Sequence, residues 1–158
     1  MPRVHEPHRF ACTTRWTGAA EGATTDYASY SRAYEVHVPG KPVLRGSAAP
    51  PFRGDGSLHN PEDLLVAALS ACHMLSYLAL AARARLSVVA YEDAATGTMD
   101  FDGGVMRFTE VMLRPRVTVA AGADVELARA LHERAHRECF IASSVAFPVR
   151  NEATIELA

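Results

Sequence analysis

The chain has 158 residues, a formal net charge of −2, and hydrophobic side chains at 49% of its positions. This length fits one domain with its own core, and we expect a single domain over residues 1–158, of which 1–10 are extended or disordered. Acidic and basic residues are mixed along the chain without a Lys/Arg run or an acidic tail, so no nucleic-acid partner is expected. Three cysteines and an amino terminus without an apolar signal core predict a reducing, cytoplasmic location, in which a bond between cysteines is transient.

The first third of the chain is predicted to consist of strands and turns. A strand is expected over residues 11–16, with Cys12 as a packing residue, because a free cysteine usually behaves as a small hydrophobe. Residues 30–38 alternate between apolar and polar side chains and predict a half-buried strand. Residues 46–59 form a Pro/Gly-rich loop that is too long for a simple connection, and loops of this kind often carry function.

A long helix is predicted over residues 61–85. Asn60 is a favourable N-cap, Pro61 suits the first helical position, and acidic residues follow in the first turn. Residues 64–82 carry no formal charge, so a membrane span has to be weighed. The stretch is only moderately apolar and stands alone between strand-like segments. We therefore expect a central helix of a soluble domain and no membrane partner.

The second half is predicted to add strands and one more helix. Strands are expected over residues 87–98 and 106–120, the latter bent or turned into an edge piece by Pro115. Asp124 is the predicted N-cap of a helix whose apolar residues recur at helical spacing as far as Cys139. A turn at 141–144 precedes strands near 145–149 and 153–158. The order of these elements predicts an α+β fold.

Cys72, inside the first helix, and Cys139, after the second, are the candidate reactive groups. Either cysteine alone is most simply a core residue. Polar neighbours of Cys72, namely Ser70, His73 and Ser76, favour a functional thiol. A nucleophilic thiol also needs a nearby cation to lower its pKa, and the candidates are Arg53, Arg32 and His73.

Glu62 lies ten residues before Cys72 on the predicted helix. This spacing corresponds to about 15 Å along the axis and roughly 80° around it, so Glu62 does not touch the Cys72 sulfur within one helix. It either stabilises the helix amino terminus through its charge, or orients an arginine, or reaches a site in a partner subunit.

A zinc site is the alternative reading of the second helix. His132 and His136 share a helical face, Cys139 follows three residues later, and Cys72 or His73 could complete the set. The pattern has no second pair of closely spaced ligands, and Glu133, Arg134 and Arg137 indicate an exposed helix. We expect no metal and no other cofactor.

Three segments of the chain together resemble the OsmC/Ohr family of osmotically inducible and organic hydroperoxide resistance proteins. They are Asn60-Pro61-Glu62-Asp63-Leu64-Leu65, the run from Ala68 to Met74, and Cys139-Phe140-Ile141-Ala142-Ser143-Ser144-Val145. The resemblance implies the OsmC-like fold, in which a long central helix and a second helix pack on antiparallel sheets. It also implies an intertwined homodimer with two active sites at the subunit interface.

The same resemblance implies a thiol-dependent peroxidase that reduces organic hydroperoxides to alcohols in the oxidative stress response. Cys72 then corresponds to the peroxidatic cysteine, Cys139 to the resolving cysteine, and Glu62 to a glutamate that pairs with the activating arginine, placed here at Arg53. An apolar wall is expected from Leu69, Leu75, Phe140 and Phe147. A dithiol, such as one of the lipoyl type, is the expected reductant. The alternative is a non-catalytic or redox-sensing OsmC-like dimer that binds a small molecule.

Overall fold

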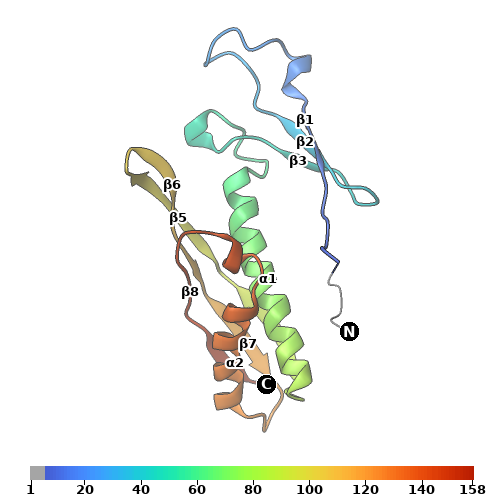
Figure 1. The fold of residues 1–158 in the computed structure, drawn as a ribbon, viewed down its shortest axis with the longest axis vertical. Coiled ribbons are helices and arrows are strands. Elements are labelled where there is room, and N and C mark those ends of the chain that lie inside the picture. The colour runs from blue at the N-terminus through green and yellow to red at the C-terminus, as the bar shows by residue number, and fades with distance from the viewer. Residues whose placement is uncertain (1–5) are drawn as a thin grey trace. The chain divides into compact units, whose positions relative to one another are not determined.

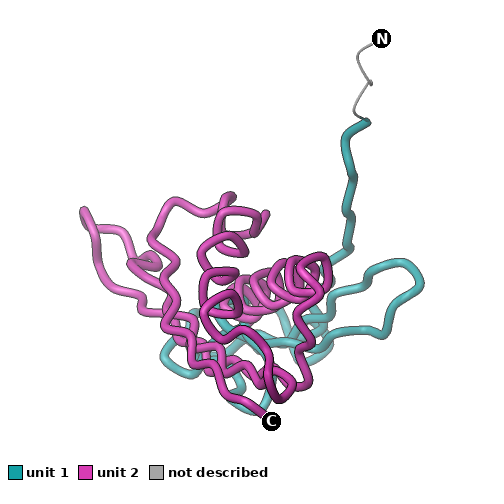
Figure 2. Tube along the Cα trace, turned by 90° about the horizontal axis from the view of Figure 1, so that it is seen from below, with its two compact units in different colours: residues 1–63 teal, residues 64–158 magenta. Residues whose placement is uncertain are grey.

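The computed structural model describes residues 6–158, which form two compact units. One unit runs from the amino terminus to Asp63 and the other from Leu64 to Ala158, so the boundary falls in the first turn of the long helix (Figure 2). The expected single domain therefore stays a prediction. Of the expected extended segment 1–10, residues 6–10 are described, and they are exposed and without regular structure.

The amino-terminal unit contains a small antiparallel sheet of strands β1 (Thr13–Trp16), β2 (Tyr34–His37) and β3 (Leu44–Gly46), in that order (Figure 1). The expected half-buried strand is thus four residues long. β1 is an edge strand whose residues are all exposed, and Cys12, directly before it, is exposed as well. The expectation that Cys12 packs in a core was wrong, because the edge of this sheet presents no covered face at that position.

The segment between β3 and the long helix is the predicted loop, tightened by a short 3₁₀ helix at Pro50–Phe52. Arg53 follows it in the left-handed backbone region, with a φ of 62°. The backbone then passes so close to itself that a Cβ on Gly54 would lie 1.5 Å from the carbonyl oxygen of Ala48. Only glycine fits there, and this contact fixes the path of the loop that carries Arg53.

Helix α1 spans Pro61–Arg83, as predicted apart from its last two residues. Its N-cap is the predicted one, because the Asp63 amide donates a 2.8 Å hydrogen bond to Oδ1 of Asn60. At its carboxyl end, Arg85 adopts a φ of 58° and Leu86 donates to the Ala81 carbonyl at 2.9 Å. This is the Schellman arrangement, here built without glycine, and it turns the chain into the next strand.

The second unit contains two three-stranded sheets. Strands β4 (Val88–Asp93), β7 (Pro115–Val119) and β9 (Thr154–Leu157) form one, and β5 (Thr96–Asp102), β6 (Val105–Leu113) and β8 (Val149–Asn151) form the other. The β6–β8 and β7–β9 pairs are parallel, so these sheets are mixed where antiparallel sheets were expected.

The single strand predicted over 87–98 was wrong, because β4 and β5 belong to different sheets. Pro115 does separate β6 from β7, but β7 lies centrally between β4 and β9. The proline is tolerated there because it is the first residue of its strand. The strand expected near 145–149 begins only at Val149.

Helix α2 (Val125–Glu138) begins as predicted, with the Asp124 carboxylate accepting a 2.9 Å hydrogen bond from the Leu127 amide. It packs against α1 over a shared core that includes Tyr77, Leu80, Ala128 and Leu131, and the Tyr77 hydroxyl donates to the Ala128 carbonyl at 3.1 Å. The two helices run side by side in the second unit (Figure 1). This core also contains β7, which places the carboxyl end of α2 beside the middle of α1.

By length and composition, α1 is the one helix in residues 6–158 that could cross a membrane. A core helix of a soluble protein passes the same test. Leu69, His73, Tyr77, Leu80 and Ala81 are buried and recur at helical spacing, so α1 presents one face to a protein core.

Candidate functional site

The two thiols predicted to be functional lie next to each other. Cys72, in the middle of α1, is partly buried, and Cys139, directly after α2, is almost fully buried. The Cys139 thiol interacts with that of Cys72. Burial, followed by this interaction, raises the pKa of Cys139 to about 11. At neutral pH Cys139 is therefore a thiol, held within reach of the other sulfur.

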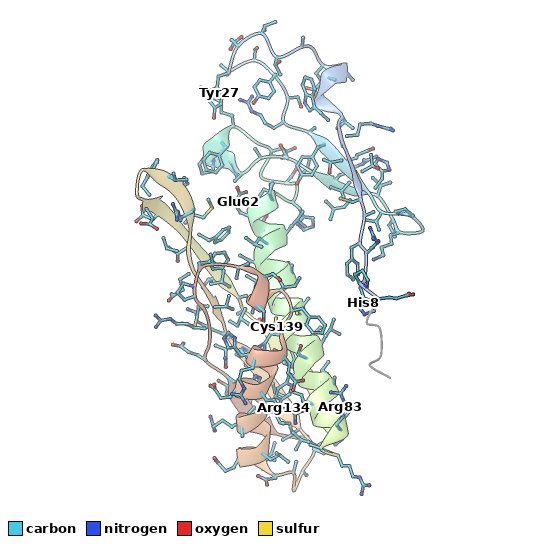
Figure 3. The ribbon with its side chains drawn as sticks, in the orientation of Figure 1. His8, Tyr27, Glu62, Arg83, Arg134 and Cys139 are labelled. Carbon is cyan, nitrogen blue, oxygen red and sulfur yellow. The ribbon has the colours of Figure 1, made fainter. Side chains whose placement is uncertain are left out.

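The end of α2 holds Cys139 in this position. The Cys139 amide donates to the His136 carbonyl at 3.3 Å, and the chain then turns into a short 3₁₀ helix, Ala142–Ser144. The Ala142 amide donates to Sγ of Cys139 at 3.4 Å, and both the amide and the hydroxyl of Ser143 donate to its carbonyl at 3.0 Å. Figure 3 labels Cys139 where this turn leaves α2 beside α1.

A second pair of side chains, His73 and His132, is buried between α1 and α2. A 3.0 Å hydrogen bond joins Nε2 of His73 and Nδ1 of His132, and both residues are at most 2% exposed. His132 also stacks on Tyr77, with ring centroids 4.1 Å apart. Burial lowers the pKa of each histidine to about 4, so both rings are neutral at physiological pH. The sequence interpretation considered His73 a possible cation beside Cys72, and this was wrong, because its environment excludes the charged form.

Arg53 and Arg32, the other candidate cations, lie in the amino-terminal unit. Arg32 donates to the carbonyls of Tyr27 and Tyr30 and lies over the Tyr30 ring, 3.7 Å from its centroid. It is thus held within its own loop. Arg53 is exposed, and its guanidinium lies 5.7 Å from the centroid of the Tyr27 ring. In residues 6–158 neither arginine forms an ion pair, so Arg53 is the less constrained of the two.

Glu62 lies in the first turn of α1, where Figure 3 labels it. Its Oε2 atom is buried and has no hydrogen-bond partner in the described part of the chain, and the same holds for the Tyr34 hydroxyl. Burial and then the Glu62 charge raise the pKa of Tyr34. The expected pair of Glu62 and Arg53 does not form within the described residues. A buried carboxylate oxygen without a partner is unusual and indicates a group that a further donor satisfies.

The side chains that were expected to form an apolar wall do not all line one surface. Leu69 is fully buried in the core, so it supplies no wall to a site, whereas Leu75 and Phe140 are exposed.

No group of three or more His, Cys, Asp or Glu side chains in residues 6–158 is arranged to hold a metal ion. The alternative zinc site of His132, His136 and Cys139, with Cys72 or His73, is therefore not assembled in these residues.

The sequence interpretation missed Tyr34 and the pairing of His73 with His132. Tyr34 was read as a strand residue only. In the structure its hydroxyl lies against Gly46, on which a Cβ would be 2.4 Å from the hydroxyl oxygen, and no sequence pattern indicates this contact. The histidines were considered only as metal ligands or as a cation.

The chain belongs to the OsmC-like protein family, whose model matches residues 54–153. Its structure is similar to that of an OsmC-like protein of unknown function, VCA0330 of Vibrio cholerae, with 33% sequence identity, coverage of 94% of this chain and 100% of that one, and a TM-score of 0.85. This agreement confirms the predicted α+β, OsmC-like fold.

More distant likenesses show the fold alone. An organic hydroperoxide resistance protein of Elizabethkingia anophelis has a TM-score of 0.71 at 19% identity, with 98% of this chain and 100% of that chain covered. The organic hydroperoxide resistance protein OsmC of Legionella pneumophila has a TM-score of 0.70 at 16% identity, covering 96% and 99%. In sequence, the uncharacterized protein YmaD of Bacillus subtilis is 27% identical over 95 residues, which is 58% of this chain and 63% of that protein.

Proposed function

We propose that this chain is a thiol-dependent peroxidase that reduces organic hydroperoxides to the corresponding alcohols. The observation that carries the proposal is the interacting pair of thiols, Cys72 and Cys139, brought together from positions 67 residues apart in the sequence. Family membership supports it, because the family includes proteins named for organic hydroperoxide resistance and thus links the chain to peroxide-related stress.

In the first step, the Cys72 thiolate attacks the outer oxygen of the hydroperoxide. The O–O bond breaks, Cys72 becomes a sulfenic acid, and the alkoxide takes up a proton and leaves as the alcohol. In the second step, the Cys139 sulfur displaces the sulfenic hydroxyl as water, and a Cys72–Cys139 disulfide forms. A dithiol, such as a dihydrolipoyl group, then reduces the disulfide and is itself oxidised to a disulfide.

Arg53 is assigned to activation of the Cys72 thiol and to polarisation of the peroxide, since Arg32 is already bound within its own loop. Glu62 is assigned to orient Arg53, and its unpartnered buried oxygen supports this role. We assign the active form to a homodimer, with active sites at the subunit interface. The exposed face of α1 supports this assignment, because it carries Leu75 and several alanines and no charge between Leu64 and Ala82.

The test is consumption of cumene hydroperoxide in the presence of dihydrolipoamide. The Cys72→Ser variant is expected to lose turnover, and the Cys139→Ser variant to complete one reduction and then stop. Cys12→Ser is the matched control, because Cys12 is exposed and lies outside this thiol pair. Peroxide consumption by Cys72→Ser at the wild-type rate would refute the proposal.

A redox-sensing dimer would give a different result. Peroxide would oxidise the pair to one disulfide per chain, but no dithiol would sustain turnover. The same experiment therefore separates the two functions.

A cytoplasmic location remains a prediction. Localisation of a tagged chain in the native cell tests it.

A further inference from the structure

An exposed tyrosine, Tyr27, lies in the loop between β1 and β2, and the proposed chemistry does not use it. Arg53 lies over its ring, with the guanidinium carbon 5.7 Å from the ring centroid. An aromatic ring attracts a guanidinium within about 6 Å, so the two form a cation–π contact. Both residues belong to the amino-terminal unit, where Figure 3 labels Tyr27. The contact thus joins the arginine assigned to activate Cys72 to a separate loop of its own unit.

Several contacts hold the Tyr27 ring in place. The Arg32 guanidinium lies 4.9 Å from the centroid of this ring and 3.7 Å from that of Tyr30, and it donates to the carbonyls of both tyrosines. The indole N–H of Trp16 on β1 donates to the Ser31 carbonyl at 2.7 Å, and the indole meets the Tyr30 ring edge-on. The loop is therefore tied both to itself and to the sheet, and its exposed ring is a fixed surface.

The two arginines beside Tyr27 use their N–H groups differently. Arg32 donates to two backbone carbonyls, whereas the Arg53 side chain forms no hydrogen bond within residues 6–158 and contacts the face of a ring. A contact to a ring face restrains the guanidinium but leaves the N–H groups in its plane free to bind a carboxylate or another oxygen. Glu62, in the same unit, has a buried oxygen that lacks a donor among the described residues. The arrangement suits an arginine that is held in place for a second partner.

The backbone fixes the other end of the Arg53 side chain. Arg53 adopts a φ of 62°, and the next residue, Gly54, passes so close to Ala48 that no Cβ fits. The side chain therefore starts from a set position and direction, and the Tyr27 ring restrains its far end. Restraint at both ends reduces the number of rotamers open to a long side chain, and a group that is already oriented loses less freedom when it binds.

We propose that Tyr27 is a positioning residue, whose ring holds the Arg53 guanidinium with its N–H groups free for the Cys72 thiolate and the hydroperoxide. The inference rests on the proposed function, in which Arg53 activates Cys72. Tyr27 takes no part in bond making or breaking and acts through Arg53 alone. Without the ring, Arg53 spreads over more rotamers, so less of the Cys72 thiol is ionised at neutral pH. Loss of a cation–π contact at an exposed site is expected to change this fraction by about 2- to 5-fold.

The test measures how fast iodoacetamide alkylates Cys72, because the thiolate is the form that reacts. A parent protein with Cys12→Ser and Cys139→Ser leaves Cys72 as the one thiol of the chain. In this parent, Tyr27→Leu is expected to slow alkylation at pH 7 by about 2- to 5-fold. At pH 10 a thiol of ordinary acidity is ionised in either protein, so the two rates should agree. Damage to the structure would change the rate at both pH values, which distinguishes it from a positioning role.

Further variants show whether the ring acts through Arg53. Tyr27→Phe keeps the ring and should react like the parent. Phe10→Leu is the matched control, since it removes a 95% exposed aromatic side chain elsewhere in the same unit and should have no effect. Arg53→Gln should be slow at pH 7, and adding Tyr27→Leu should slow it no further. An unchanged rate in Tyr27→Leu, an equal loss at pH 7 and pH 10, or a further loss in the double variant would overturn the inference.

Single-turnover reduction of cumene hydroperoxide by the same proteins separates failure of this inference from failure of the proposed function. If the parent does not reduce the hydroperoxide, but Tyr27→Leu slows alkylation at pH 7 only when Arg53 is present, the peroxidase proposal fails and the positioning role stands. If Tyr27→Leu and the parent reduce the hydroperoxide equally fast and are alkylated equally fast, the positioning role fails alone.

Discussion

Acidification is expected to destabilise the fold through the buried pair of His73 and His132. The pKa of each is lowered from 6.5 to about 4, mainly by burial. Between these values the unfolded chain binds protons that the folded chain does not, so stability falls as the pH falls from about 6.5 toward 4. For pKa values of 6.5 and about 4, the loss between pH 7 and pH 5 is about 2 kcal/mol for each imidazole.

Both histidines together give a loss of about 4 kcal/mol, a large part of the 5–15 kcal/mol that stabilises a typical domain. With a urea dependence of about 2 kcal/mol per M, the unfolding midpoint should drop by about 2 M. The assay is urea unfolding followed by circular dichroism at pH 7 and pH 5, at one fixed protein concentration.

The double variant His73→Leu with His132→Phe isolates the contribution of the pair. Apolar side chains of similar volume fill the space without a group that titrates, so most of the pH dependence should disappear. The control His37→Gln, in the other unit, should retain it. A wild-type midpoint that is the same at both pH values would refute the reasoning, and so would a double variant with the wild-type pH dependence.

Four further substitutions test the local structure by urea unfolding. Arg85→Gly should stabilise the chain by about 1 kcal/mol, because glycine adopts the left-handed backbone at that position without strain. Arg83→Gly, at the last residue of α1, should instead destabilise it by up to about 1 kcal/mol. Stabilisation by both would contradict this account. Gly54→Ala should cost several kcal/mol or prevent folding of its loop, since the added Cβ would meet a backbone oxygen at 1.5 Å, and normal stability would show that the loop path is wrong. Asp124→Ala should cost about 1 kcal/mol through loss of the α2 cap, while an unchanged midpoint would mean that this hydrogen bond contributes nothing.

The helices were the most predictable part of the fold. Asn60 and Asp124 each cap a helix through a hydrogen bond to an amide three residues later, so the information lies within one turn of the chain. The strands were harder to predict. Residues 87–98 read as one strand, but β4 and β5 join different sheets: β5 forms a hairpin with β6, which follows it directly, whereas β4 pairs with β7, which comes only after that hairpin. Local alternation does not encode which partner a strand takes.

The candidate site, like the fold, was only partly predictable from the sequence. The sequence by itself predicted the candidate site residues, because the types and positions of Cys72, Cys139 and Glu62 resemble a family pattern. It also determined where α1 and α2 begin. Only the tertiary structure decided that the two sulfurs meet and that His73 pairs with a neutral His132 and carries no charge. The reason is physical: contacts and dielectric surroundings depend on how two helices pack, and that packing is set by the whole core.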